Sequence, residues 1–160
     1  MADRLTKEQR SLNMSHVKGK NTKIEVLVRS YLFREGFRFR KNDKRLPGHP
    51  DVVLPKYKTV IFVNGCFWHQ HPGCKKATIP ETNHDFWAKK LESNVVNDKL
   101  IRDALEKMGW KVITVWECEL KKHFSDVMAR IVHILRQKRV MGTTSEYPHG
   151  RPERGAELKR

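Results

Sequence analysis

The segment TVIFVNGCFWHQHPGC, residues 59–74, contains the centre of the predicted fold and most of the predicted chemistry. Its first five residues are a continuous run of β-branched and aromatic side chains, which is typical of a central strand buried on both faces. From Gly65 to Pro80 the chain is irregular and crowded with cysteine, histidine and aromatic residues. We therefore predict a buried strand that leads directly into a functional loop.

Three helices are predicted from apolar residues at spacings of three and four. The first begins at Thr22, which forms the Thr-x-x-Glu pattern of a capping box with Glu25, and it ends at Gly36. The second runs from about Asp85 to Met108 before Gly109, with an apolar stripe made by Trp87, Leu91, Val95, Leu100, Ile101, Ala104 and Leu105. The third covers residues 126–138, with an inward face made by Val127, Ile131, Ile134 and Leu135.

Three further strands accompany the central one. Residues 37–40 alternate as Phe-Arg-Phe-Arg, residues 51–54 form a short apolar run stopped by Pro55, and residues 112–115 form another apolar run. Helices against a mixed sheet indicate an α/β fold. Outside this domain, residues 1–20 read as a basic arm without a sustained apolar period, and residues 141–160 as a polar, flexible tail.

The composition indicates a basic protein of one domain, with 160 residues and a formal net charge of +15. DNA, RNA and anionic membranes all fit such a charge, and a general solubilising charge is the alternative. Residues 4–47 hold thirteen Lys or Arg against four Asp or Glu, which favours phosphate contacts there. No apolar run is long enough to span a membrane, and residues 1–10 lack the apolar core of a signal peptide.

The chain has three cysteines, an odd number that argues against a disulfide framework and fits a reducing cytoplasm. Together with one histidine they make a four-ligand set of the kind that structural zinc prefers: Cys66, His71, Cys74 and Cys118. His69 competes with His71 as the histidine ligand, and spacing does not choose between them. The alternative is buried free thiols beside a surface histidine.

Asp51 follows a turn and opens a strand, as does the metal-binding aspartate of many nucleases. Such enzymes often carry Glu-x-Lys on the next strand, where this chain has Val63-Asn64-Gly65 instead. His69 lies just beyond and is the usual type of base near neutral pH, and Glu25 could supply a second carboxylate. A capping role for Asp51 after Pro50 is the alternative.

Aromatic side chains stand beside basic ones at two places. Phe67-Trp68 lies in the cysteine loop and could wedge between base pairs, with Met14 acting from the other side of the duplex. Trp87, near Lys89 and Lys90, could contact the backbone or a base. Core packing is the alternative for each of these residues.

Several motifs together resemble the very-short-patch-repair (Vsr-type) DNA mismatch endonucleases over residues 8–120. They are Arg10-Ser11-x-Asn13-Met14, Thr22-x-Ile24-Glu25, Leu46-Pro47-Gly48-x-Pro50-Asp51, Gly65-Cys66-Phe67-Trp68-His69, Phe86-Trp87 and Val115-Trp116-Glu117-Cys118. The resemblance implies a restriction-endonuclease-like α/β domain with a structural zinc, here residues 21–140. It also implies nicking of one strand of duplex DNA 5′ to the thymine of a T·G mismatch, which arises when 5-methylcytosine deaminates.

The resemblance further implies site roles. Asp51 and the carbonyl of Val63 would bind magnesium, His69 would be the general base, and Glu25 would hold a water of the magnesium site. Zinc would be bound by Cys66, His71, Cys74 and Cys118. DNA would be contacted by Met14, Phe67, Trp68, Trp87, Lys90 and Asn94. The partner would be T·G-mismatched double-stranded DNA, bound by a monomer in a prokaryotic cytoplasm, at the nucleoid when it acts, with a possible mismatch-repair protein partner.

The chain departs from the family pattern at two positions. Asn64 stands where the family often has histidine, and an amide can hydrogen-bond a water but cannot titrate. The zinc loop reads His71-Pro72-Gly73-Cys74, with one extra residue before the second cysteine. Two other functions stay open from the sequence: a zinc-stabilised DNA-binding module without catalysis, and a restriction-type endonuclease that cuts matched DNA.

Overall fold

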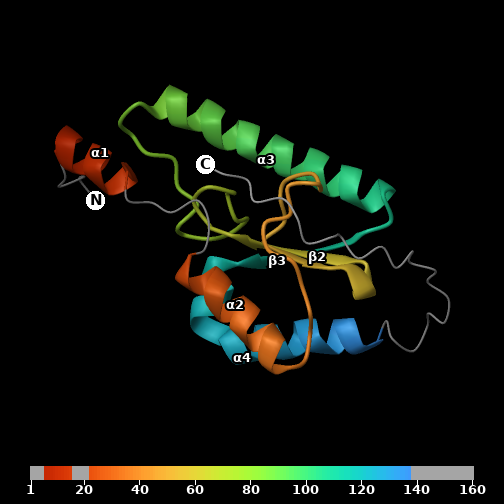
Figure 1. The fold of residues 1–160 in the computed structure, drawn as a ribbon. Coiled ribbons are helices and arrows are strands. Elements are labelled where there is room, and N and C mark those ends of the chain that lie inside the picture. Colours follow the sequence, from red (N-terminus) through yellow and green to blue (C-terminus); the bar gives the residue numbers. More distant parts are fainter. Residues whose placement is uncertain (1–5, 16–21, 138–160) are drawn as a thin grey trace, which may run out of the picture.

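The computed structural model describes residues 6–15 and 22–137 of the chain. Within these ranges a mixed sheet is flanked by helices on both faces (Figure 1). The elements in chain order are α1 (Lys7–Ser15), α2 (Lys23–Arg34), β1 (Val52–Leu54), the 3-10 helix η1 (Pro55–Tyr57), β2 (Thr59–Asn64), α3 (His84–Lys107), β3 (Lys111–Trp116) and α4 (Glu117–Gln137). None of the described helices is both long and apolar enough to cross a membrane.

The three strands lie in the order β1-β2-β3, so the predicted central strand is central. β1 pairs antiparallel with β2, with Val52 opposite Ile61. β3 pairs parallel with β2 along its whole length, from Thr59 opposite Lys111 to Asn64 opposite Trp116. Because β2 and β3 run in the same direction, α3 carries the chain back along the sheet between them.

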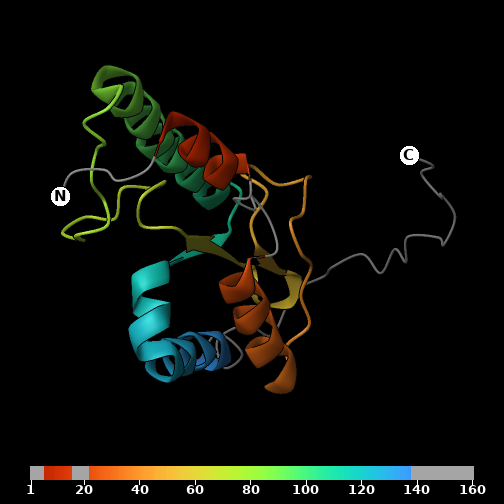
Figure 2. The same ribbon diagram turned by 90° about the vertical axis from the view of Figure 1, so that its left-hand side faces the viewer.

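The sheet separates two apolar cores. The ribbon shows α2 and α4 on one side of the sheet and α3 on the other (Figures 1 and 2). On one face, α2 and α4 cover a larger cluster that includes Leu32, Ile61 and Leu135. On the other face, α3 covers a smaller cluster around Leu105 and Trp110. The strand residues alternate between these two cores, which explains why the β2 sequence is apolar without interruption.

The first predicted helix is confirmed. The Thr22 hydroxyl accepts a hydrogen bond of 3.3 Å from the Glu25 amide, so Thr22 caps α2 as its sequence indicates. Beyond the helix, Gly36 has a φ of +90°. Val28 and Leu32 of this helix are buried, together with the charged side chains of Glu25 and Arg29, whereas the apolar Leu27 is 53% exposed.

The predicted strand at residues 37–40 is wrong. The segment forms only a single bridge, in which Arg40 and Val53 exchange hydrogen bonds of 2.8 and 2.9 Å. Its alternation has another cause, because Phe37 is buried in the larger core and Phe39 packs against that core. An extended segment can place every second side chain inward without forming a ladder.

The predicted inward stripe of α3 is only partly right. Leu91 and Leu105 are buried, whereas Val95 is 44% exposed and Leu100 62% exposed. Both exposed residues lie between the two buried leucines, so the cause is the face of the helix on which they stand. Leu100 is nine residues after Leu91, roughly two and a half turns, and therefore points away from the sheet. Val95 lines a pocket between the helix and the sheet.

Two further helical segments differ from the prediction. α4 begins at Glu117, nine residues before the expected start, and it has a kink at His123 with φ −136° and ψ 44°. Its first part contains Cys118, one of the predicted zinc ligands. A short helix, α1, lies in the basic arm, where no helix was predicted.

The turn before β1 packs closely against α3. Gly48 has a φ of +73°, and a Cβ atom built there would lie 2.6 Å from the Ile101 side chain. A glycine is therefore required on both conformational and steric grounds. The close approach places the following residues, Pro50 and Asp51, at the edge of the sheet.

Candidate active site and metal centre

The predicted site residues converge at one edge of the sheet. β2 and β3 are parallel and in register, so the loop after Asn64 and the start of α4 after Trp116 leave the sheet at the same edge. β1 runs antiparallel to β2, and therefore Asp51, which precedes it, lies at this edge too. The carboxyl ends of parallel strands are where α/β proteins commonly build their sites.

Asp51 is held at both its side chain and its main chain. Its Oδ2 accepts a hydrogen bond of 2.7 Å from the Val63 amide. Its main-chain oxygen accepts bonds of 3.2 and 3.1 Å from Nε and Nη2 of Arg29. The carboxylate thus binds a residue twelve positions away, which disfavours the local capping role considered for Asp51.

Glu25 and Arg29 form a buried ion pair beside Asp51. The Glu25 Oε2 and the Arg29 Nη2 are 3.3 Å apart, and both residues are 5% exposed. Burying charges is costly unless they are paired and hydrogen-bonded, so this arrangement needs a reason beyond packing. Arg29 was missed from the sequence, although an arginine four residues after Glu25, next to the apolar Val28, is an available signal.

The electrostatics of Asp51 favour a cation. Burial and the neighbouring Glu25 carboxylate raise the pKa of this carboxyl, the Val63 amide, Arg29 and His69 lower it, and the net result is a pKa of about 6. The ionised carboxylate is therefore under-stabilised, and a nearby divalent cation would stabilise it. Carboxylate and carbonyl oxygens are the ligands that magnesium prefers, so Asp51 with the adjoining Val63 peptide fits such an ion.

His69 is oriented by a partner from α3. Its Nδ1 lies 2.6 Å from Oδ2 of Asp98, and both side chains are about one-third exposed. With Nδ1 engaged, Nε2 is the ring nitrogen that can accept a proton from water. Asp98 was missed from the sequence because it stands 29 positions away, in the middle of a helix without a local motif.

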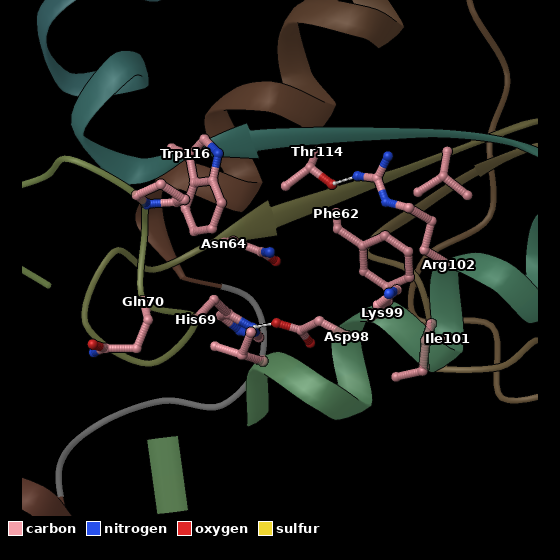
Figure 3. Close-up of a pocket in the computed structure, with 14 residues that line it drawn as sticks. Phe62, Asn64, His69, Gln70, Asp98, Lys99, Ile101, Arg102, Thr114 and Trp116 are labelled. Carbon is pink, nitrogen blue, oxygen red and sulfur yellow. Dashed lines mark hydrogen bonds and ion pairs between the residues drawn. The ribbon is translucent and has the colours of Figure 1, made fainter. Parts of the chain in front are cut away.

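A pocket of about 370 Å³ opens between α3 and the ends of β2 and β3. Asn64, His69 and Asp98 face this space from three different segments (Figure 3). Its apolar walls come from Phe62, Val95, Ile101, Val112 and Trp116. Asn64 is buried and lines this pocket. Its amide can therefore hydrogen-bond a water or a polar group there.

The four predicted zinc ligands come together. One ligand atom from each of Cys66, His71, Cys74 and Cys118 lies within 4.8 Å of all the others. Nδ1 of His71 is 3.3 Å from the Cys118 sulfur and 3.7 Å from the Cys66 sulfur. Neighbouring ligands in a tetrahedral zinc site are about 3.5–3.8 Å apart, so the cluster could hold such a metal with small adjustments. Of the two candidate histidine ligands, His71 lies in the cysteine cluster, whereas His69 pairs with Asp98.

The loop backbone and one aromatic side chain shape this cluster. The His71 amide donates to the Cys66 carbonyl, and the Cys74 amide donates to the His71 carbonyl. The extra residue in the loop forms a turn in which Gly73 has a φ of +72°. The His71 ring stacks on Trp116 at 4.2 Å with an interplanar angle of 10°.

The two loop cysteines differ in their electrostatic surroundings. Burial raises the pKa of Cys66 to about 11, whereas the Lys76 amide lowers the pKa of Cys74. A thiol that is buried without a metal stays protonated at neutral pH, and a divalent metal stabilises the thiolate. The donor set, with Cys66 buried and the other three ligands half-buried, thus fits a structural metal that would tie the loop to the start of α4.

An aromatic cluster lies on the other side of the same loop. The Phe67 and Trp68 ring centroids are 5.1 Å apart, and they lie 5.7 and 5.9 Å from the Trp87 centroid. Phe67 and Trp68 are half-buried and belong to neither apolar core, so they are not core plugs. The exposed Phe86 extends the cluster by contact with Trp87 at 5.4 Å.

The three remaining residues predicted to bind DNA, Asn94, Lys90 and Met14, have different surroundings. The Asn94 Nδ2 donates a bond of 3.0 Å to the Trp68 carbonyl, so this amide braces the aromatic loop. Lys90 is exposed on α3 in the turn after Trp87. The side chain of Met14 lies outside the described part of the structure.

Comparisons with known proteins show which family this chain resembles. A family model described as "DNA mismatch endonuclease Vsr" matches residues 2–76. The chain is 54% identical over 121 residues to the type II nicking enzyme V.NmeAIP of Neisseria meningitidis, covering 76% of this chain and 86% of the relative. It is 44% identical over 135 residues to the type II nicking enzyme V.XorIIP of Xanthomonas oryzae, covering 84% and 98%. It is 42% identical over 121 residues to the DNA mismatch endonuclease Vsr of Escherichia coli, covering 76% and 77%.

Proposed function

This chain belongs to the Vsr family of DNA mismatch endonucleases, and from that premise we propose that it nicks one strand of duplex DNA 5′ to the thymine of a T·G mismatch, with magnesium as the catalytic cation. As a member of this family it is a DNA-cleaving hydrolase with a restriction-endonuclease-like fold. The T·G pair left by deaminated 5-methylcytosine is the proposed substrate, and the nick would start very-short-patch repair.

One observation carries the proposal: Asp51, Glu25 and His69 meet at a single edge of the sheet, directly beside the aromatic cluster. The carboxylates and the histidine supply the two needs of phosphodiester hydrolysis, a cation site and a base. The aromatic side chains supply a means of opening a base step next to that chemistry.

Magnesium at Asp51 would neutralise charge on the phosphate and stabilise the leaving oxygen. The Val63 carbonyl, at the same edge, completes the protein's oxygen donors to the cation. Glu25 accepts a hydrogen bond from a water beside the cation and so orients it. Each of these groups is immobilised by buried hydrogen bonds, which reduces the ordering needed when the substrate binds.

His69 takes the proton from the attacking water at Nε2. Asp98 holds a proton on the other ring nitrogen, Nδ1, by a hydrogen bond. Its carboxylate also stabilises the positive charge that the ring acquires. Asn64 holds a water or a phosphate oxygen by a hydrogen bond and does not titrate, so His69 carries the base function alone.

Mismatch selection is assigned to Phe67 and Trp68, which insert beside the T·G pair, with Met14 entering from the other groove. A wobble pair stacks less well than a matched pair, and prying its step apart therefore costs less free energy. Trp87 and Lys90 contact the duplex from α3. Asn94 acts by holding the Trp68 main chain rather than by touching a base.

The metal at Cys66, His71, Cys74 and Cys118 is proposed to be structural zinc. It would fix the aromatic loop before DNA binds, so less binding energy is lost in ordering that loop. Three cysteine sulfurs and one imidazole make a closed donor set with no place left for a substrate, which is typical of structural sites.

The test compares nicking of T·G and T·A duplexes that share all flanking bases, with and without magnesium. The wild-type chain should nick only the T·G duplex, in the thymine strand, and only with the cation. Asp51→Ala and His69→Ala should keep the fold and lose nicking, while the exposed controls Asp103→Ala and His133→Ala keep it. Equal cutting of T·A would indicate a restriction-type activity, and activity in either site variant would reject that residue's role.

A further inference from the structure

Arg29 occupies a central place in the site without an assigned role. Its guanidinium contacts both the main-chain oxygen of Asp51, at 3.2 Å from Nε and 3.1 Å from Nη2, and the Glu25 carboxylate, at 3.3 Å from Nη2. The side chain is 6% exposed, so it reaches these partners inside the protein. One buried cation therefore joins the two carboxylate residues of the proposed cation site.

The main chain of Asp51 needs such an anchor. The paired region of β1 and β2 begins at Val52, and the preceding turn contains two residues with positive φ, Gly48 and His49. Asp51 thus lies at the boundary between a turn and a strand, where the sheet does not yet hold the backbone. The Arg29 bonds fix its carbonyl, and the Val63 amide fixes its carboxylate. The main chain and the side chain of Asp51 are then both held in place.

The chemistry of the guanidinium suits this double role. It is planar and presents several N–H donors in a fixed fork, so it can hold a carbonyl and a carboxylate at a defined spacing. It also carries a positive charge that offsets the repulsion between Glu25 and Asp51 when both are ionised. A lysine ammonium is a point charge without this fork and would hold the two groups less rigidly.

We propose that Arg29 is a positioning residue of the active site, which sets the spacing between Asp51 and Glu25 so that both serve one divalent cation. This role rests on the proposed magnesium-dependent nicking. It differs from a purely structural ion pair within α2, because the bonds to Asp51 link the helix to the cation site 22 residues along the chain.

The test uses Arg29→Lys in the whole 160-residue chain, bound to a T·G duplex that already carries the nick at the scissile position, so that no cleavage occurs during the measurement. Binding of Mn²⁺, measured by electron paramagnetic resonance, should weaken roughly 10- to 100-fold, as happens when groups that orient metal ligands are removed. The magnesium concentration for half-maximal nicking should rise in parallel on the ordinary duplex. The Tm and the Kd for the T·G duplex should stay near the wild-type values.

Arg136→Lys is the matched control, because Arg136 pairs with Glu35 at 3.0 Å in an exposed position. A double-mutant cycle with Glu25→Gln adds a second measure: if Arg29 acts through Glu25, the two losses of Mn²⁺ affinity will be less than additive. Arg29→Gln is the second variant in case the lysine variant folds poorly, since glutamine can still donate to the Asp51 carbonyl.

Unchanged Mn²⁺ binding in folded Arg29→Lys would overturn the positioning role and leave the proposed function intact. Loss of folding in both Arg29 variants would also overturn it, because the residue would then be needed for structure alone. A wild-type protein that neither binds Mn²⁺ at this site nor needs magnesium for nicking would overturn the proposed function itself, and the role of Arg29 with it.

Discussion

Among single residues, Asp51 holds a carboxylate in surroundings that oppose its ionisation. Burial is the main cause, and the Val63 amide and the Arg29 guanidinium offset it only in part. The ionised form of such a group is unfavourable unless a cation binds nearby. This behaviour is expected of a metal ligand in a preorganised site. The consequence is measurable in the protein without added magnesium.

The first prediction concerns the pH dependence of stability. The pKa of Asp51 is raised from 3.8 to about 6 on folding, so its stabilising contribution is full below about pH 4 and is lost as the pH rises through 6. The difference corresponds to about 3 kcal/mol. In urea unfolding from pH 4 to 8 without magnesium, wild-type stability should therefore fall relative to Asp51→Asn, which cannot titrate. The prediction would be contradicted if the difference in unfolding free energy between the wild type and Asp51→Asn did not change with pH.

The second prediction concerns the partner of His69. Asp98→Asn keeps the shape of the side chain but removes the charge that stabilises the protonated ring. We expect kcat for nicking the T·G duplex to fall at least about tenfold, with the Kd for DNA unchanged. Single-turnover nicking and fluorescence anisotropy measure the two quantities, and the exposed Asp103→Asn is the control. A change confined to DNA affinity would show that Asp98 is not acting through the base.

At the scale of elements, the parallel pairing of β2 and β3 assembles the cluster of three cysteines and His71 that could hold a metal. Their register brings Asn64 beside Trp116, and so the cysteine loop meets the first turn of α4. Trp116 then contributes its ring to His71, and Glu117–Lys122 form a helical segment before the kink at His123. The bend in α4 lets its first turn carry Cys118 to the loop while the rest of the helix covers the core.

The third prediction follows from this arrangement. Cys118→Ala removes the ligand that connects the loop to α4, so zinc content should drop well below one per chain and the Tm should fall. Mass spectrometry of the bound metal and thermal unfolding measure these effects, with the exposed Lys122→Ala on the same helix as control. Retention of a full equivalent of zinc in Cys118→Ala would mean that the ligand set is different.

At the scale of the whole molecule, the net charge of +15 sets the strength of DNA binding more than its selectivity. Phosphates are the same in every duplex, whereas the wedge that we propose for the aromatic loop would respond to how easily a base step opens. The proposal thus assigns affinity and mismatch selection to different parts of the protein. The described residues form one candidate active site, so we propose that a monomer nicks one strand. Analytical ultracentrifugation of the protein–DNA complex can test this oligomeric state.

The fourth prediction separates these two contributions. The plot of log Kd against log salt concentration should be steep and should have the same slope for T·G and T·A duplexes, because counterion release depends on phosphate contacts. The two lines should be offset vertically by the free energy of mismatch recognition. Fluorescence anisotropy at several salt concentrations measures both quantities. Different slopes would mean that the mismatch changes the number of phosphate contacts.

The regular elements were predictable where the local pattern and the tertiary packing agree. The apolar run of β2 and the capped α2 are such cases, since burial and capping act within a few residues. The prediction failed at residues 37–40, where alternation reflected burial of Phe37 without a ladder, and at Leu100, which lies on the face of α3 that points away from the sheet. Both outcomes depend on the size and position of neighbouring elements.

The sequence by itself determined which residues have suitable chemistry, because an aspartate after a turn, a histidine or a cysteine carries its reactivity wherever it is placed. It thereby identified Asp51, His69 and the three cysteines. Only the tertiary structure decided who their partners are: it assigned His71 to the cysteines and His69 to Asp98, and it joined Asp51 to Arg29. Among them, the contacts of Arg29 with Asp51, of His69 with Asp98 and of His71 with Cys118 connect residues 22 to 47 positions apart. They follow from strand register and helix placement, which no local pattern encodes.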